Sequence, residues 1–362
     1  MQRVKGVGIA AAVAAVLVVT TQAVGGTNLM SIGVLNPAPD GTVASGVYAT
    51  SPEGTYAVGY SDGPDSAGTA TIQQPIIWSQ ATGLVQLPNP VDIDGQARGV
   101  VVRPNAGMIG IAGNINNRMY YYQAPPDNLA SGSWTENGRS ERGLIGPYNT
   151  ARLGVDYPAT EGWFIGGDYS GSLKDYVQGV DGPASLDHKN TGGGECVSHS
   201  VSGEKWTAGY DHGNPGGQHR ALFMNYNNGD VQVVIPGGSS YLSEALGISA
   251  AGTVLSGYDA SDATNNQAFV WKVGDAAMTL LDTLPGDTQS NAITVNLIGS
   301  DYITAGYSSD GANERAVIWD TTGTWDNTGQ PKLVSDLLAT LGGDLSVWTN
   351  LTRVTTMSDD GM

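Results

Sequence analysis

Cysteine is almost absent from this sequence, and basic residues are scarce. The 362 residues include one cysteine, Cys196, so no intramolecular disulfide can form. Lys and Arg total 16 against 34 Asp and Glu, which gives a formal net charge of −18 at pH 7. A surface of that sign repels the phosphate backbone, so nucleic acid is excluded as a partner. Because 40% of the residues are hydrophobic, the chain can bury a sizeable core.

Long apolar runs are confined to the N-terminus. Arg3 and Lys5 precede the apolar residues 7–19, a run shorter than the roughly 20 residues that span a bilayer. Thr21-Gln22-Ala23 then offers a small-x-small cleavage site. We expect residues 1–23 to be a secretory signal peptide, with a retained membrane anchor as the alternative. Cleavage leaves 14 basic against 34 acidic residues, or −20, in an extracellular or cell-surface protein without a membrane span.

A short phrase recurs about every fifty residues through the mature chain. It consists of an apolar stretch, a turn with Gly, a second apolar stretch, and then Gly followed in most copies by Tyr, Asn or Asp. The copy at residues 249–259 reads SAAGTVLSGYD. The second glycine of the phrase falls at Gly59, Gly113, Gly167, Gly209, Gly257 and Gly306.

Each repeat also carries an apolar-aromatic segment such as residues 267–271 (QAFVW) and, in several copies, a further apolar run such as residues 83–87 (GLVQL). Four short strands in about fifty residues are typical of one propeller blade. The sequence therefore predicts an all-β chain, with residues 24–362 forming a β-propeller of four-stranded antiparallel blades. Helix is expected in the signal segment and near residues 335–341. We expect the first Gly to form a turn, the second to lie where strands crowd, and the aromatic residues to fill the space between blades.

The chain ends within a further copy of the phrase, at residues 356–361. Residues 28–37 (NLMSIGVLNP) echo the fourth-strand segment, which predicts that the N-terminus supplies the outer strand of a seventh blade. We expect six complete blades, an incomplete seventh, and a full protein about twenty residues longer.

These motifs resemble the extracellular HAF-repeat family, secreted bacterial proteins with β-propeller-like repeats. The matching pieces are residues 247–252 (GISAAG), 257–259 (GYD), 267–271 (QAFVW) and 335–345 (SDLLATLGGDL). The resemblance covers residues 46–362. Repeats two and three depart from it most, with Tyr120-Tyr121-Tyr122 and Asp175-Tyr176-Val177 in place of Ala-Phe-x-Trp. Many members carry a Pro-Glu-Pro type sorting signal, so the family implies surface anchoring.

Two motifs invite a catalytic or metal-site interpretation. Residues 59–63 (GYSDG) match the G-x-S-x-G of serine hydrolases, but the motif requires a helix after the turn, and here the phrase is part of the repeat. Cys196 and His199 stand three apart on an expected strand and so face opposite sides. We expect Cys196 to be a buried, unreactive core residue, and we expect no zinc at Asp211-His212 and His219.

Two acidic loops and one insert are further candidates for binding. Residues 62–65 (DGPD) and 92–95 (DIDG) could hold calcium through oxygen ligands, but neither has the full calcium-loop spacing, so solvated turns are favoured. Residues 131–148 break the repeat, and we expect a loop or hairpin projecting from one face.

No catalytic or metal residue can be assigned, and the ligand-binding residues stay unknown. The sequence favours a secreted, non-catalytic propeller that binds a glycan or a cell-surface protein, and a purely structural surface-layer component is a further interpretation. The alternative is an envelope polysaccharide-degrading enzyme, which needs two carboxyls about 5 to 9.5 Å apart in the central channel.

Overall fold

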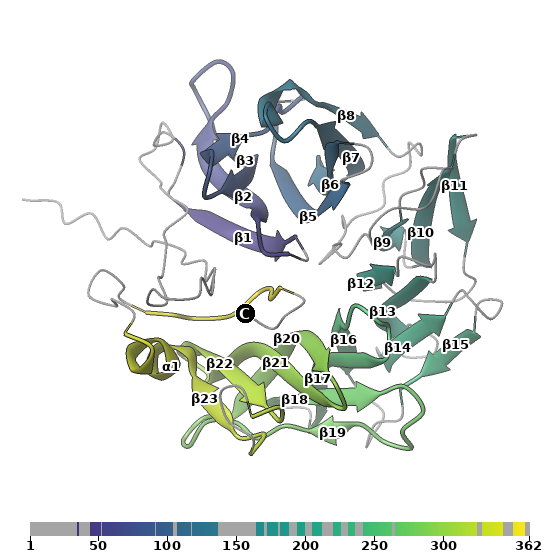
Figure 1. Cartoon of the computed structure of the whole chain (residues 1–362), viewed down its shortest axis with the longest axis vertical. Coiled ribbons are helices and arrows are strands. Elements are labelled where there is room, and N and C mark those ends of the chain that lie inside the picture. The colour runs from purple at the N-terminus through teal and green to yellow at the C-terminus, as the bar shows by residue number, and fades with distance from the viewer. Residues whose placement is uncertain are drawn as a thin grey trace, which may run out of the picture.

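The computed structural model describes part of the chain (Figure 1). The described residues are 35, 44–51, 53–90, 92–103, 107–116, 118–136, 164–169, 172–179, 182–187, 194–199, 205–211, 220–225, 231–235, 242–262, 265–323, 328–342 and 350–358. The expected signal peptide, His212, His219 and most of residues 28–37 lie outside them.

Six antiparallel sheets, which we call blades 1 to 6, follow one another along the described chain. Within each sheet, neighbouring strands are consecutive in the sequence. Blade 1 has β1 (Ser45–Thr50), β2 (Tyr56–Pro64), β3 (Thr71–Ser79) and β4 (Gly83–Gln86); blade 2 has β5 (Gly95–Arg103), β6 (Met108–Ile115), β7 (Arg118–Ala124) and β8 (Ser133–Glu136); blade 3 has β9 (Phe164–Tyr169), β10 (Ser172–Gly179) and β11 (Gly182–Asp187). Blade 4 has β12 (Gly194–His199), β13 (Lys205–Asp211), β14 (Arg220–Asn225) and β15 (Val231–Val234); blade 5 has β16 (Ser243–Ile248), β17 (Val254–Asp262), β18 (Asn265–Lys272) and β19 (Thr279–Leu280); blade 6 has β20 (Gln289–Ile298), β21 (Asp301–Ser309), β22 (Glu314–Asp320) and β23 (Pro331–Leu333).

The six sheets stand around a common centre, and the first strands β1, β5, β12, β16 and β20 lie nearest to it (Figure 1). The prediction of a β-propeller with four-stranded antiparallel blades is confirmed. A short helix, α1 (Val334–Thr340), follows β23 where the sequence predicted one. A 3-10 helix, η2 (Leu129–Ser131), precedes β8.

The two repeat glycines have the predicted roles. Gly252 ends the turn between β16 and β17 with φ +65, a conformation that side-chain-bearing residues rarely adopt. A Cβ on Gly257 would lie 1.9 Å from the carbonyl oxygen of Glu244 on the neighbouring strand. In blades 1, 2, 5 and 6, the second glycine of the phrase therefore lets the first and second strands approach closely.

Aromatic residues of the third strands fill the space between blades, as predicted. Trp271 of β18 belongs to a cluster that joins blades 4 and 5, together with Trp206 and Phe223. Trp319 of β22 is fully buried among residues of blades 5 and 6, and its indole N–H donates to the carbonyl of Asp282 at 2.9 Å. Because each of these clusters takes residues from two sheets, blades 4, 5 and 6 bury these faces against one another.

The expectation of a projecting insert after residue 131 is wrong for its first part. Residues 133–136 form β8, which pairs with β7 as the fourth strand of blade 2. Trp134 packs against the core between blades 1 and 2 and donates its indole N–H to the carbonyl of Pro88 at 2.6 Å. The strand escaped the sequence argument because it sits at the outer edge and buries a single large side chain. Residues 137–148 lie outside the described part.

Blade 3 shows three strands among the described residues. Its β9 contains Gly167, the second glycine of the phrase, and so corresponds to a second strand. The departing triplet Asp175-Tyr176-Val177 lies in β10, which pairs with β9 and β11. The altered triplet is thus compatible with an ordinary antiparallel pairing.

Candidate functional site

One layer of polar and aromatic residues recurs near the inner edge of the blades. In blades 2, 5 and 6, a residue of the first strand pairs in register with the residue after the second glycine: Gln96 with Asn114, Glu244 with Tyr258, and Asn291 with Tyr307. In blade 1 the pair is Gly46 and Tyr60. In blades 2, 5 and 6 these pairs therefore lie on the first strand, which is near the centre of the ring, and on the second strand beside it (Figure 1).

Three side chains at blades 1 and 2 form the most developed part of this layer, which we call the Tyr-Arg platform: Tyr48, Tyr60 and Arg98. The Tyr48 and Tyr60 rings lie 5.6 Å apart at 32°. The Arg98 guanidinium lies 3.7 Å above the centre of the Tyr48 ring, a cation–π contact. All three residues are half-buried, so each keeps part of its surface exposed to solvent.

The chain geometry around the platform explains why these residues meet. Tyr48 and Arg98 occupy bulges, where the pairing of β1 and of β5 skips one residue. A Cβ on Gly46 would lie 2.7 Å from the Tyr60 ring, so glycine there makes room for the ring. The bulge turns a side chain out of the regular alternation, which is how such sites re-aim residues.

Hydrogen bonds hold Arg98 in place from the side of blade 2 and link that blade to blade 1. Arg98 donates to the Gln96 side-chain oxygen, and the Gln96 amide donates to Gln73 of β3. The guanidinium is therefore oriented before any ligand arrives. Preorganisation of this kind reduces the entropy lost on binding.

A related arrangement stands at blade 6. The Arg353 guanidinium lies 5.0 Å from the centre of the Tyr307 ring, and its Nε donates to the Glu314 carboxylate at 2.9 Å. Here the arginine is paired with a carboxylate, whereas Arg98 is held by an amide.

Burial raises the pKa of two tyrosines of this layer, Tyr60 and Tyr307. For Tyr60, burial raises the pKa most, Asp62 raises it further, and Arg98 acts in the opposite direction. Burial likewise raises the pKa of Tyr307, with Glu314 adding to the effect and Arg353 opposing it. Both phenols therefore stay neutral at physiological pH, where each can donate and accept a hydrogen bond.

The acidic loops use their carboxylates to fix turns. Asp65 accepts from the Thr69 backbone N–H at 2.6 Å, and such bonds lower the pKa of its carboxyl. Asp92 accepts from both the backbone and the hydroxyl of Ser66 at 2.7 and 2.6 Å. Within the described residues there is no group of three or more His, Cys, Asp or Glu side chains that could hold a metal ion.

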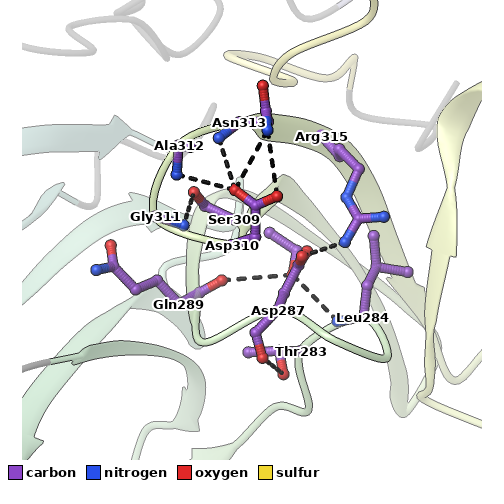
Figure 2. Close-up of polar contacts among 11 residues, drawn as sticks. Thr283, Leu284, Asp287, Gln289, Ser309, Asp310, Gly311, Ala312, Asn313 and Arg315 are labelled. Atoms are coloured by element: carbon purple, nitrogen blue, oxygen red, sulfur yellow. Dashed lines mark hydrogen bonds and ion pairs between the residues drawn. The ribbon is translucent and has the colours of Figure 1, made fainter.

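The loop between β21 and β22 repeats this pattern next to an ion pair whose carboxylate is buried (Figure 2). Asp310 accepts from the backbone N–H groups of Ala312 and Asn313, each at 2.8 Å, and these bonds lower the pKa of its carboxyl. Arg315 pairs with Asp287, whose side chain is fully buried. These groups brace the loop that precedes the third strand of blade 6.

The hydrolase-like motif is part of the repeat. Ser61 lies inside the continuous strand β2 with no helix following, and its buried hydroxyl accepts from the Leu35 N–H at 3.0 Å. Cys196 lies on β12, where its backbone pairs with Ala208, and His199 pairs with Lys205. The structure describes the backbone of Cys196 and His199 but not their side chains. The expectation that the Cys196 thiol is buried and unreactive therefore stays a prediction.

Sequence reasoning did not find Tyr48, Arg98 or Arg353. The available signal was the recurring Tyr after the second glycine, at Tyr60 and Tyr307. What faces those rings depends on bulges and on the next blade, and neither is encoded in the local pattern.

No protein-family model and no curated protein sequence matches the chain. Several solved structures are similar in fold. TolB from Acinetobacter baumannii is 11% identical with a TM-score of 0.46, covering 75% of this chain and 62% of its own. A structure of the nidogen/laminin complex is 11% identical with a TM-score of 0.43, covering 73% and 89%. The β-propeller domain of the trilobed protease from Pyrococcus furiosus is 8% identical with a TM-score of 0.45, covering 80% and 84%.

This chain thus spans about three fifths of the TolB chain. Of the helices in the described part of the chain, none has the length and apolar character needed to cross a bilayer.

Proposed function

We propose that this β-propeller is a secreted, non-catalytic binding module that takes an extracellular glycan or cell-surface protein at the inner edge of blades 1 and 2. The Tyr-Arg platform carries the proposal. Aromatic and arginine side chains are the residues most enriched at binding hot spots. Tyr48, Tyr60 and Arg98 are grouped, half-buried and mutually oriented on the strands of blades 1 and 2. Secretion and membership of the HAF-repeat family are parts of this proposal that rest on the sequence motifs.

Three described carboxyl groups do not have the character that the enzymatic alternative requires of a general acid. A glycosidase needs a general acid whose pKa is raised. The carboxyls of Asp65 and Asp310 have lowered pKa values, and Glu314 forms an ion pair with Arg353. These described groups act as turn and ion-pair partners, a role that suits a binding scaffold.

A glycan array probed with residues 24–362, followed by titration of each hit, tests the proposal. Arg98→Ala should weaken binding about tenfold or more, because it removes the oriented guanidinium. Arg98→Lys keeps the charge but loses the planar stack, so it should recover only part of the affinity. Lys332→Ala is the matched control: it removes a positive charge from the outermost strand of blade 6 and should bind like the wild type.

Thermal melting of each variant separates lost affinity from lost folding. If Arg98→Ala binds the ligand with the same affinity as the wild type, the binding site lies elsewhere on the ring. Turnover of an arrayed polysaccharide would favour the enzymatic alternative instead.

A further inference from the structure

A bulge recurs at one place on the first strands of the blades. In blades 1, 2, 4, 5 and 6, the pairing of the first strand with the second skips one residue, directly after the residue opposite the second glycine of the phrase. The repeat therefore fixes where the skipped residue lies, while its type differs from blade to blade. We call these positions the bulge row: Tyr48, Arg98, Glu195, Leu246 and Ile293.

Four side chains of the bulge row are partly exposed between buried neighbours. Tyr48, Arg98, Leu246 and Ile293 are half-buried, whereas the residues directly before and after each of them are buried. A bulge turns a side chain out of the regular alternation of a strand. The bulge row therefore presents large side chains to solvent from a part of the first strand whose flanking positions are closed.

Members of the row in adjacent blades lie side by side. The Arg98 guanidinium of blade 2 stands 3.7 Å from the centre of the Tyr48 ring of blade 1. Blades 5 and 6 approach each other at the same place, because a Cβ on Gly247, the residue after Leu246, would lie 2.6 Å from the Ile293 carbonyl oxygen. The bulges thus form neighbouring pairs and not isolated irregularities.

The two pairs differ in chemistry. Tyr48 and Arg98 make a polar and aromatic pair, whereas Leu246 and Ile293 make an aliphatic pair. The strands that carry the first pair, β1 and β5, lie across the centre of the ring from β16 and β20, which carry the second (Figure 1). Aliphatic side chains offer no hydrogen bond to a sugar hydroxyl, and covering such a hydroxyl with them costs free energy. They suit an apolar side chain of a protein ligand instead.

We propose that the bulge row sets the specificity of the binding site, and that its ligand is a segment of a partner protein with an acidic and an apolar side chain. Arg98 takes the carboxylate, because a guanidinium already oriented by Gln96 suits charge-assisted hydrogen bonds. Leu246 and Ile293 take the apolar side chain. A chain with a net charge of −18 repels an acidic ligand over most of its surface, so a carboxylate needs this local guanidinium. The inference rests on the proposed function, because the Tyr-Arg platform is one of its two halves.

An array of short synthetic peptides, probed with residues 24–362, tests the proposal. Each peptide carries one acidic, basic or amide residue and one aliphatic, aromatic or polar residue in a Gly-Ser background, with the spacing between the two varied. Peptides that combine an acidic residue with an apolar one should bind about tenfold or more tightly than peptides that lack either.

Variants of the two pairs assign each preference to its residues. Arg98→Ala should remove the preference for the acidic residue and keep the preference for the apolar one. The double variant Leu246→Asn, Ile293→Asn should do the reverse, and Leu246→Met, which stays apolar, should keep both preferences. Leu280→Asn is the matched control: Leu280 is 46% exposed on β19, the outer strand of the blade that carries Leu246, so the variant should bind like the wild type. Thermal melting of each variant identifies any loss of folding.

The outcomes separate this inference from the proposed function. If no peptide binds, or if the preference for an apolar residue survives in the double variant, the inference is overturned. The proposed function still stands in that case when binding of an arrayed glycan depends on Arg98. If the peptides bind and Arg98→Ala keeps the preference for the acidic residue, both the inference and the assignment of the site to the Tyr-Arg platform are wrong.

Discussion

Thr50 and Thr356 are 306 positions apart in the sequence, and their hydroxyl oxygens lie 3.1 Å apart. The pair spans nearly the whole described chain. In each described four-stranded sheet, neighbouring strands are consecutive in the sequence, so the sheets form from local hairpins. The contact between the last blade and the first joins residues that are much farther apart in the sequence. Forming it costs the loop-closure entropy of the whole chain between them.

The first prediction follows from that cost. The Thr50→Cys, Thr356→Cys, Cys196→Ser protein should be stabilised on oxidation by up to about 5 kcal/mol, because the cross-link removes a very long loop from the unfolded state. Guanidinium unfolding with and without reductant measures the gain. Equal midpoints in both samples would mean that the junction opens before the ring unfolds.

The second prediction concerns the crowded glycine. In Gly306→Ala, the new Cβ would lie 1.9 Å from the Asn291 carbonyl oxygen, so the first two strands of blade 6 must separate. We expect a loss of at least about 3 kcal/mol in the free energy of unfolding. Gly311→Ala is the control: its Cβ meets no atom within 4 Å, and its φ of +92 should cost about 1–2 kcal/mol. If both variants lose the same free energy of unfolding, backbone conformation and not crowding explains why glycine recurs at this position.

The third prediction tests the packing between blades. Trp319 is fully buried between blades 5 and 6, so Trp319→Phe should lower the free energy of unfolding by about 2 kcal/mol through lost volume and a lost hydrogen bond. Trp134→Phe removes the same groups at a half-buried outer edge and should cost less than about 1 kcal/mol. Urea titration of both variants gives the comparison, and a larger loss at Trp134 would contradict it.

Repetition made the fold predictable from the sequence. The clash that requires Gly306 involves a backbone oxygen of the adjacent strand, and the same clash requires glycine at Gly59, Gly113 and Gly257. Trp134 shows the opposite case. Its outer strand packs only one face against the core, so a short, mostly polar segment can form it, and such a segment has no apolar pattern that predicts a strand. Arg98 could not be assigned to a site because its partner Tyr48 lies on another blade, across a bulge in each strand.

The last prediction concerns acid. Backbone and side-chain hydrogen bonds from Ala312 and Asn313 hold the pKa of Asp310 below its ordinary 3.8. A carboxyl with a lowered folded-state pKa adds stability above the unfolded pKa and loses it as the pH falls through the folded pKa. Asp310→Asn keeps an acceptor oxygen but does not titrate, so it should be less stable than the wild type near pH 7. The two unfolding free energies should converge only below pH 3.8, where the wild-type carboxyl also becomes neutral.

Asp310→Ala lacks the acceptor oxygen and should stay less stable than the wild type at every pH. Chemical denaturation from pH 2 to 7 measures all three, and a wild-type advantage over Asp310→Asn that is constant with pH would show that the loop does not depend on the charge.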